Sequence, residues 1–453
     1  MSQSAIFDLI VLGTGTAGSS VARRCRRAGW SVAIVDTGAF GGTCALRGCE
    51  PKKVLWTIAN AADQARRLAT VGLPGCRDAT LDWEALQRFK RSFTDPVPER
   101  MATEFRSLGI EALRGAPRFV SRDAVEIDSR RLTARHFVIA TGARPTTLPI
   151  KGRELLVTSD DFLALDALPR RLLLIGGGYI GFEIAHIARR GGADVVILHE
   201  DGRPLSGFDR VLVDRLIDEC KRVGIAVELQ AEVKAIERCG DGFHVMARRS
   251  GKKASWEGDL AIHAAGRVPN LDNLALDAAE VERDGRRLKL DQHLRSVSNP
   301  LVFAAGDAAQ AGPPLTPVAT IDAEIVAGNL LDAGTREPNY RGVPSGVFSI
   351  PPLVRVGLTE EEAQEQKLDF DIHEGDMSDF QSIRRLRHEA AAYRILIERR
   401  TERLLGAHLL GPSAEEVINL FGLAIRLGIG ADKLRQLVSC YPSFASNVTE
   451  MIG

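Results

Sequence analysis

The sequence has no net charge, no apolar run of membrane length and few cysteines, and each absence excludes a class of protein. Its 453 residues carry 59 Lys and Arg against 59 Asp and Glu, which gives a formal net charge of +0. That balance supplies no long-range attraction for nucleic acid or an anionic membrane. No apolar stretch approaches the ~20 residues of a membrane-spanning helix. Seven cysteines in so long a chain do not indicate a disulfide scaffold.

Targeting segments and sequence repeats are also missing. Residues 1–7 contain neither a basic n-region nor an apolar h-region, so we expect no secretory signal. Together with the few cysteines, this favours a cytoplasmic protein whose thiols are mostly reduced. Hydrophobic residues at 45% and charged residues at 26% are ordinary for a soluble globular chain. The length predicts roughly two to four domains.

A dinucleotide-binding fingerprint is present at the start of the chain. Its parts are an apolar strand over residues 6–12, a glycine turn, a helix over 19–28 and a strand over 31–35 that ends at Asp36. The turn carries Gly13, Gly15 and Gly18. Such glycines let the backbone approach a pyrophosphate, and the helix N-terminus favours the phosphates. Asp36 follows Gly13 by 23 residues, the place of an acid that accepts from a ribose 2′-OH.

The same pattern recurs further along the chain. A strand over 171–175 leads into a second glycine turn, followed by a helix to about residue 190 and a strand over 194–198. The glycines of this turn are Gly176, Gly178 and Gly181. Two fingerprints indicate two nucleotides or one bridging pair. An enzyme that passes electrons from a nicotinamide to a bound flavin needs such a pair.

Two further strands end in small-residue turns, and the last part of the chain forms a separate module. The strand that ends near residue 139 leads into Thr141–Gly142, and the one that ends near 304 leads into Gly306–Asp307. From about Tyr340 onward the chain has strand-like runs over 347–350 and 393–398 and a helix over 414–427. This part carries no glycine fingerprint, which predicts a third module.

Cys44 and Cys49 form the most distinctive feature of the sequence. On an ideal helix, residues five positions apart have Cα atoms about 8 Å apart, beyond the roughly 4.4–6.8 Å that a disulfide accepts. Gly48 and Pro51 would permit the necessary distortion. A disulfide that closes so small a loop is more plausibly redox-active than structural. The glycines before it, with Lys52 and Lys53 after it, would favour the thiolate once the disulfide is reduced. The alternative is a pair of unrelated buried cysteines. The remaining cysteines are isolated: Cys25, Cys76, Cys220, Cys239 and Cys440.

On these motifs the chain resembles the flavin-dependent pyridine nucleotide-disulphide oxidoreductases of the glutathione reductase and dihydrolipoamide dehydrogenase type. Residues 41–53 match the redox-disulfide motif of that family. Residues 140–142, 305–307 and 315–317 match its flavin-domain signatures, in order along nearly the whole chain. The resemblance implies an α/β fold with Rossmann-like FAD and NAD(P) domains and a C-terminal α+β dimerisation domain, assembled as a homodimer. The expected domains are 1–148 with 270–340 for FAD, 149–269 for NAD(P) and 341–453 for the dimer interface.

The resemblance also implies a role for each site residue. Hydride from NAD(P)H arrives on one face of one FAD per chain, and the Cys44–Cys49 disulfide lies on the other face. Cys49 would be the flavin-proximal sulfur and Cys44 the thiol that attacks substrate. Lys52 would pair with Glu183 beside the flavin.

Further residues are expected to bind the cofactors on the same basis. Tyr179 would gate the nicotinamide pocket, and Asp307 would hold the ribityl chain. The other cofactor-binding residues expected from the motifs are Gly42, Thr43, Thr141, Gly142, Gly266, Gly306 and Thr316.

The chain departs from the disulfide reductases at their proton shuttle. Tyr441 stands where the family has a histidine, supplied by the partner subunit, and Ser446 stands where it has the glutamate that orients it. A tyrosine with a pKa near 10 is a poor proton shuttle at neutral pH. Mercuric reductases also replace this histidine by tyrosine, but their C-terminal cysteine pair has no counterpart before Gly453. Cys440 could supply one thiol, and the alternative is that it and Tyr441 only pack at an interface.

Other departures disfavour glutathione. Glu324 stands where those reductases hold a glutathione carboxylate with arginine, and the chain has no tyrosine before Tyr179. We therefore expect a non-glutathione acceptor: a metal ion, a quinone-like molecule or a disulfide with a low-pKa thiolate. The alternative enzyme is an orthodox disulfide reductase or dihydrolipoamide dehydrogenase with another proton donor. A non-catalytic redox-sensing flavoprotein is disfavoured by the intact cysteine pair, Lys52 and Glu183.

The second fingerprint favours NADH over NADPH. The residue 23 positions after Gly176 is His199, and Glu200 follows it. NADPH enzymes of this family place arginines in this region to bind the 2′-phosphate. Here Glu200 and Ser206 occupy those places, and only Arg203 is a candidate. Glu200 could accept from a ribose hydroxyl and would repel a phosphate.

Overall fold

The computed structural model describes residues 6–332 and 334–453, and the chain divides into two compact units. The first unit contains the chain up to Lys52, Lys90–Thr146 and Arg267–Tyr340. The second contains Lys53–Phe89, Thr147–Gly266 and Arg341–Gly453. The three domain boundaries expected from the sequence stay a prediction. Residues 1–5, part of the segment in which no secretory signal is expected, lie outside the described residues.

The first unit is built on a seven-stranded sheet with the order β3-β2-β1-β6-β5-β4, in which β18 also pairs with β6. Its parallel strands are β1 (Ile6–Leu12), β2 (Val32–Asp36), β3 (Glu111–Arg114), β6 (Arg130–Ile139) and β18 (Val302–Ala304). The antiparallel strands are β4 (Arg118–Ser121) and β5 (Ala124–Ile127). β1 is buried on both faces over most of its length, as expected for a continuous apolar run in a parallel sheet.

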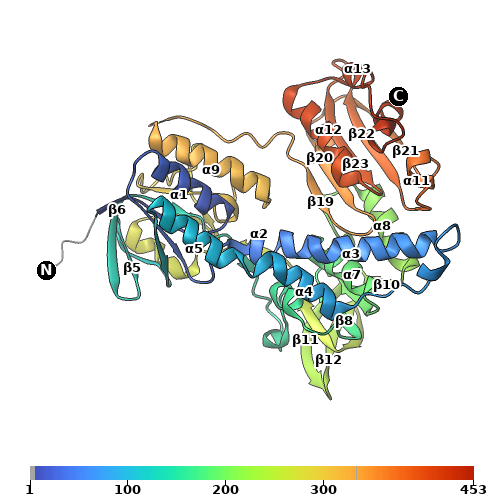
Figure 1. Ribbon diagram of the computed structural model, residues 1–453, viewed down its shortest axis with the longest axis horizontal. Helices are drawn as coiled ribbons and strands as arrows, with labels where there is room; N and C mark the ends of the chain where they lie inside the picture. The colour runs from blue at the N-terminus through green and yellow to red at the C-terminus, as the bar shows by residue number, and fades with distance from the viewer. Residues whose placement is uncertain (1–5, 333) are drawn as a thin grey trace. The chain divides into compact units, whose positions relative to one another are not determined.

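Helices cover this sheet. α1 (Thr16–Arg27) and α9 (Thr316–Leu331) pack side by side, coloured blue and orange in Figure 1. α5 (Val97–Leu108) packs against α1. α1 begins at Thr16, earlier than the predicted residue 19, because Gly15 already serves as its N-cap. Two small antiparallel pairs also belong to the unit: β7 (Ala143–Pro145) with β15 (Arg267–Pro269), and β16 (Arg283–Asp284) with β17 (Arg287–Leu288).

Two helices carry the chain from one unit to the other. α2 (Gly42–Arg47) belongs to the first unit, and α3 (Cys49–Leu68) begins in it and continues into the second. α4 (Trp83–Thr94) runs across the division at Phe89 and Lys90.

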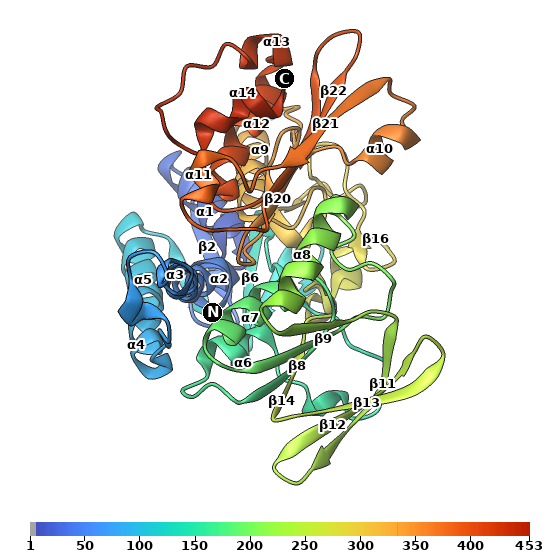
Figure 2. The same ribbon diagram turned by 90° about the vertical axis from the view of Figure 1, so that its right-hand side faces the viewer.

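The second unit contains a four-stranded parallel sheet with the order β10-β9-β8-β14, part of which Figure 2 shows in green. Its strands are β8 (Arg171–Ile175), β9 (Asp194–Leu198), β10 (Ile225–Glu228) and β14 (Leu260–His263). Its helices are α6 (Ser159–Ala164), α7 (Tyr179–Arg190) and α8 (Arg210–Arg222). The bounds predicted for the strands over 171–175 and 194–198 are confirmed.

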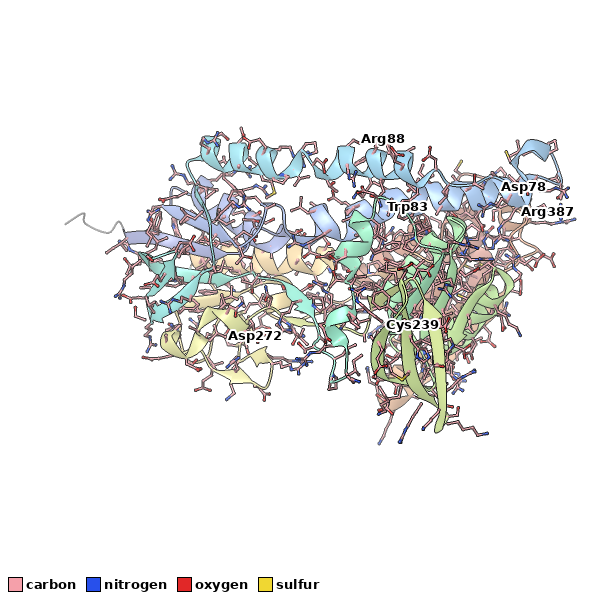
Figure 3. The ribbon with its side chains drawn as sticks, turned by 90° about the horizontal axis from the view of Figure 1, so that it is seen from below. Asp78, Trp83, Arg88, Cys239, Asp272 and Arg387 are labelled. Carbon is pink, nitrogen blue, oxygen red and sulfur yellow. The ribbon has the colours of Figure 1, made fainter. Side chains whose placement is uncertain are left out.

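An antiparallel three-stranded sheet lies in the same part of the chain. It consists of β11 (Ala231–Cys239), β12 (Gly242–Arg249) and β13 (Lys252–Gly258). Figure 3 labels Cys239 on this sheet.

The C-terminal part of the second unit is a five-stranded antiparallel sheet with the order β19-β20-β23-β22-β21. Its strands are β19 (Ser345–Val347), β20 (Leu353–Gly357), β21 (Phe370–Asp376), β22 (Ala392–Glu398) and β23 (Leu404–Leu410). Its helices are α10 (Glu360–Glu365), α11 (Gln381–Arg384), α12 (Ala414–Leu427), α13 (Ala431–Leu434) and α14 (Val448–Met451). The helix predicted over 414–427 is confirmed. The strand predicted over 347–350 was wrong, because prolines at 351 and 352 follow and the strand ends at Val347.

Within residues 6–332 and 334–453, no helix combines the length and the apolar character needed to cross a bilayer.

Candidate active site

Two glycine-containing turns of the first unit touch each other. α1 begins directly after Gly15, and its first turn, which is fully described, carries no acidic side chain. The N–H groups of that turn favour a bound anion. Gly42 has a φ of +67°, and a Cβ built on it would lie 2.4 Å from the Cα of Gly15. Because only glycine fits at position 42, the two turns form a narrow cradle of backbone, which suits a diphosphate.

Asp36 fixes this cradle. Its Oδ2 accepts hydrogen bonds from the backbone N–H of Thr14 at 2.9 Å and from the Thr14 hydroxyl at 2.6 Å. The same hydroxyl accepts from the N–H of Gly41 at 3.1 Å, so one side chain ties both turns together. The Asp36 Oδ1 accepts from the N–H of Gly38 at 3.0 Å. Sequence reasoning missed Thr14, although a hydroxyl directly after the first glycine was the available signal.

The turns after β6 and β18 lie at the same edge of the sheet as the cradle. β1 pairs in parallel with β2 and β6, and β18 pairs in parallel with β6, so the carboxyl ends of these strands meet. The hydroxyl of Thr141 donates to the Asn270 carbonyl at 2.7 Å, and the Asn270 N–H donates to the Gly142 carbonyl at 2.9 Å. Nucleotides bind at this edge in open α/β sheets.

Asp307 is a half-buried carboxyl at that edge. Burial raises the pKa of Asp307, and the nearby Arg267 opposes the shift. The preceding Gly306 donates its N–H to Asp322 Oδ2 at 2.9 Å, and Tyr340 donates its hydroxyl to Asp322 Oδ1 at 2.6 Å. Asp322 therefore positions the turn that carries Asp307. The glycine cradle, the helix N-terminus and this carboxyl together fit the FAD that the family resemblance implies.

The helix is broken between the two cysteines. α2 ends at Arg47, Gly48 is not helical, and α3 starts at Cys49. A Cβ built on Gly48 would lie 2.7 Å from the carbonyl oxygen of Thr43, so a side chain there would push the two turns apart. The distortion expected at Gly48 is confirmed. It brings the Cys44 and Cys49 side chains within hydrogen-bonding reach, with both present as thiols.

The two thiols have different surroundings. The hydroxyl of Thr316 donates to Cys44 Sγ at 3.2 Å and lies 3.9 Å from Cys49 Sγ. The hydrogen bond to Cys49, together with burial, raises the pKa of Cys44. Cys49 is more exposed and is the first residue of the 20-residue helix α3. A helix N-terminus favours a thiolate, and the assignment of the thiolate of the reduced pair to Cys49 stays a prediction.

Glu183 is a buried carboxyl of α7 in the second unit. Its Oε1 accepts hydrogen bonds from Lys53 Nζ at 3.1 Å and from the Phe348 N–H at 2.9 Å. The Lys53 ammonium also lies 3.7 Å from the centre of the Phe348 ring. Sequence reasoning assigned no such role to Lys53. Lys52 falls in the first unit, so its expected pairing with Glu183 stays a prediction.

His199 occupies, in the second fingerprint, the place that Asp36 holds in the first. Its Nδ1 accepts from the N–H of Gly177, the second residue of the glycine turn, at 3.2 Å. Its Nε2 lies 3.0 Å from the carbonyl of Arg203, to which it donates. Both ring nitrogens are therefore used within the protein. The next residue, Glu200, is exposed and lies two residues after the end of β9, and its expected ribose-binding role stays a prediction.

Arg203, the candidate for binding a 2′-phosphate, forms its hydrogen bonds within the protein. Its Nη1 bonds to Glu361 Oε1 at 3.1 Å, and its Nη2 donates to the Phe208 carbonyl at 2.5 Å. The remaining residues of this fingerprint lie where the sequence predicts: Gly176, Gly178 and Gly181 in the β8–α7 turn, Tyr179 as the first residue of α7, and Gly266 between β14 and β15. The Tyr179 side chain is partly exposed.

The C-terminal segment presents Tyr441 to solvent. Tyr441 is 79% exposed, and Cys440 beside it is also exposed. The Ser446 hydroxyl donates to the Ser443 carbonyl at 2.7 Å and accepts from the Ser443 N–H at 3.3 Å. Ser446 is therefore engaged in a turn of its own segment.

The isolated cysteines differ from the pair. Burial raises the pKa of Cys25 and of Cys220 to about 12, which keeps both as inert thiols. Among the described residues, no group of three or more His, Cys, Asp and Glu side chains could hold a metal ion.

The predicted residues thus fall into two groups, one in each unit. The first unit holds Gly13, Gly15, Gly18, Asp36, Gly42, Thr43, Cys44, Cys49, Lys52, Thr141, Gly142, Gly306, Asp307 and Thr316. The second holds Gly176, Gly178, Tyr179, Gly181, Glu183, Glu200, Gly266 and Tyr441.

Family models match almost the entire chain. Residues 7–323 match the model described as pyridine nucleotide-disulphide oxidoreductase, and residues 343–452 match the dimerisation domain of the same family. These matches confirm the resemblance and the fold class predicted from the sequence.

Known proteins of several activities are similar to this chain. A glutathione reductase of Burkholderia cepacia is 32% identical, over 93% of this chain and 92% of its own length. A mercuric reductase of Bacillus cereus is 28% identical, over 98% of this chain and 70% of its own length. Among solved structures, the Cu(II) complex of the HOCl-induced flavoprotein disulfide reductase RclA from Escherichia coli has a TM-score of 0.89 and 25% identity, over 99% of each chain.

Proposed function

The chain belongs to the family of pyridine nucleotide-disulphide oxidoreductases, FAD-dependent enzymes that use pyridine nucleotides, and we propose that it reduces a thiolate-binding metal ion with electrons from NADH. Cu(II) is the acceptor to test first. The electrons would pass through Cys44 and Cys49. The proposal includes a cytoplasmic location, since a thiol pair reduced by NADH needs a reducing compartment that contains NADH.

The observation that carries the proposal is the pair of Cys44 and Cys49 in a chain that has Tyr441 in place of the proton-shuttling histidine. Cys44 and Cys49 share Thr316 and lie at the start of α3, an arrangement that favours one thiolate and one thiol. Thiolates are preferred ligands of soft metal ions such as Cu(I). A metal acceptor releases no thiolate that needs a proton, so the replacement of the histidine by Tyr441 has no cost for this reaction.

The reaction balances with the residues present. Hydride from NADH and the Cys44–Cys49 disulfide give NAD⁺, one thiol and one thiolate. Two Cu(II) ions then each take one electron, the S–S bond re-forms, and the proton of the thiol goes to water. When bound, FAD supplies the two-electron relay between the hydride and the disulfide. In this proposal the Gly15–Gly42 cradle holds its diphosphate, Asp36 its ribose and Asp307 its ribityl chain.

The relatives support a metal acceptor. The E. coli RclA structure is described as a Cu(II) complex, and mercuric reductases are among the similar proteins. Glu324 disfavours glutathione as the acceptor, because it stands in the place of an arginine that binds a glutathione carboxylate. Glu324 is exposed and has Arg24 at 3.8 Å.

NADH is the proposed electron donor. Glu200 lies at the end of β9, where an acid accepts from a ribose hydroxyl. Arg203, the candidate for a 2′-phosphate, is engaged by Glu361 and the Phe208 carbonyl. Two acids, Glu200 and Asp201, would also repel the phosphate of NADPH.

The working assembly in this proposal is a homodimer. The matched dimerisation domain spans residues 343–452. This part of the chain exposes large apolar side chains, with Leu423 at 54%, Leu427 at 66% and Val438 at 95%. A second copy of the chain would cover them, and its Tyr441 would approach the cysteine pair, as in the family pattern.

The test is copper reduction under anaerobic conditions. The FAD-loaded enzyme is mixed with NADH and Cu(II), and Cu(I) is followed with a Cu(I)-selective chelator. We expect two Cu(I) for each NADH oxidised, and Cys44→Ser or Cys49→Ser should lower the rate about 100-fold or more, the loss expected for a nucleophile or relay removed. Cys239→Ser, at an exposed cysteine at the end of β11, serves as the matched control.

An orthodox disulfide reductase is the second candidate, and the 32% identity to a glutathione reductase favours it. Glutathione disulfide and lipoamide are therefore assayed beside Cu(II). If glutathione disulfide is turned over as fast as NADH reduces the flavin, the metal-acceptor proposal is wrong and an unidentified proton donor serves the site.

A further inference from the structure

The loop between β9 and α8, residues 199–209, is held by side chains from the C-terminal part of the second unit. Glu361 of α10 binds Arg203 through Oε1 at 3.1 Å. Arg355 of β20 donates through Nη1 to the Gly207 carbonyl. Arg394 of β22 donates through Nη1 to Asp209 Oδ2 at 2.6 Å. The shape of this loop is therefore set by a part of the chain that lies far away in sequence.

The far end of the loop is rigid. The Arg394 side chain is 8% exposed and that of Asp209 is 1% exposed. Arg394 also binds Glu360 at 2.8 Å, and Asp209 Oδ1 accepts from the Leu212 N–H at 3.1 Å, which caps α8. A buried ion pair with its hydrogen bonds satisfied holds one geometry. The loop cannot swing as a whole to meet a different nucleotide.

Arg203 is the only arginine or lysine of residues 199–209. The loop follows the second strand of the fingerprint, the place where the adenosine ribose of a dinucleotide binds. A 2′-phosphate there would require a cation, and Arg203 is the one that the loop offers. Its guanidinium instead uses Nη1 for Glu361 and Nη2 for the Phe208 carbonyl.

We propose that Glu361 determines the preference for NADH by holding Arg203 away from the ribose 2′ position. Glu361 acts through Arg203 and is a positioning residue. The inference rests on the proposed NADH preference and deepens it. Discrimination against the 2′-phosphate then has two sources: repulsion by the acidic residues of the loop, and the carboxylate of Glu361, which binds Arg203.

The experiment measures binding of 2′,5′-ADP and of 5′-AMP, which differ only by the 2′-phosphate, to the full-length, FAD-loaded enzyme by calorimetry. Glu361→Gln keeps the size of the side chain and removes the charge. The Glu361 and Arg203 side chains are 45% and 31% exposed, so the variant should fold. We expect the affinity ratio of 2′,5′-ADP to 5′-AMP to rise about tenfold, the effect of one released charge-assisted hydrogen bond. Glu365→Gln, on the exposed end of the same helix, is the matched control and should leave the ratio unchanged.

A double variant tests whether the change in the affinity ratio acts through Arg203. Arg203→Ala with Glu361→Gln should return the ratio to its wild-type value, because the freed guanidinium is then missing. The ratio of kcat/KM for NADPH to that for NADH should follow the same order across the variants. A merely structural role of Glu361 would weaken both ligands equally and leave both ratios unchanged.

The outcomes separate this inference from the function on which it rests. If wild-type enzyme binds 5′-AMP better than 2′,5′-ADP and Glu361→Gln does not change the ratio, the role of Glu361 is wrong while the NADH preference stands. If the gain persists in the double variant, Arg203 is not its source and the inference fails. If wild-type enzyme already prefers 2′,5′-ADP, the NADH preference and the inference fail together.

Discussion

Cys44 and Cys49 have different surroundings although both contact the same threonine. The hydrogen bond to Cys49 and burial raise the pKa of Cys44, whereas Cys49 starts α3. We therefore expect the FAD-loaded Cys44→Ser variant to keep the long-wavelength absorption of a thiolate against a flavin, since Cys49 remains. Cys49→Ser should lose that band. Absorption spectra between pH 6 and 9 show which variant keeps the band. If only Cys49→Ser kept it, Cys44 would be the thiolate that lies against the flavin.

At the scale of single residues, the motifs predicted which side chains belong to the candidate site. They predicted the hydrogen-bond partners of those side chains less well. The residues that the motifs single out at the carboxyl edge of the first sheet lie there because adjacent parallel strands end together. Sequence reasoning missed that Thr14 ties Asp36 to Gly41, and no local pattern predicts that Lys53 binds Glu183. Such hydrogen bonds depend on how a helix or turn is rotated about its axis. A rotation by one residue brings a different side chain to the same partner.

At the scale of elements, the contact between two turns makes Gly42 critical. Its φ of +67° and the 2.4 Å approach of a built Cβ to Gly15 leave no room for alanine. Gly42→Ala should cost about 1–2 kcal/mol from the left-handed conformation, with more from the clash of backbones. We expect weaker FAD retention on gel filtration and a lower unfolding temperature.

Gly72→Ala is the matched control for this prediction. Gly72 has open space around a built Cβ and an ordinary φ. Equal FAD retention in both variants would show that the contact between the turns does not shape the cofactor site.

The ends of elements were predictable where the flanking residues carry a local signal. The strands over 171–175 and 194–198 and the helix over 414–427 are bounded by glycine, polar and charged residues, and their bounds are confirmed. The start of α1 was predicted late, because the turn of a fingerprint already contains the first helical residues. The contact between Arg203 and Glu361 joins positions 158 residues apart, and no local pattern predicts it.

At the scale of the whole molecule, the proposed dimer decides which acceptors the enzyme can serve. Tyr441 is 79% exposed in the single chain, which suits a residue that a second copy covers. Ser446, in the place of the orienting glutamate, is engaged by Ser443. Tyr441→His alone should therefore raise turnover of glutathione disulfide little, since an imidazole without a carboxylate partner is poorly oriented.

Tyr441→His combined with Ser446→Glu should raise that turnover about tenfold, a modest part of the 10²–10⁴-fold that positioned acid–base groups supply. Tyr441→Phe is the control for size without a titrating group. Reduction of the flavin by NADH, followed in a stopped-flow instrument, should stay the same in all three variants, because in the arrangement that the resemblance implies hydride arrives on the face away from the disulfide. If the double variant gains nothing while the flavin is reduced normally, the missing proton shuttle is not what limits disulfide substrates. The electrostatic repulsion at Glu324 would then be the remaining barrier, and Glu324→Arg would be the change to add.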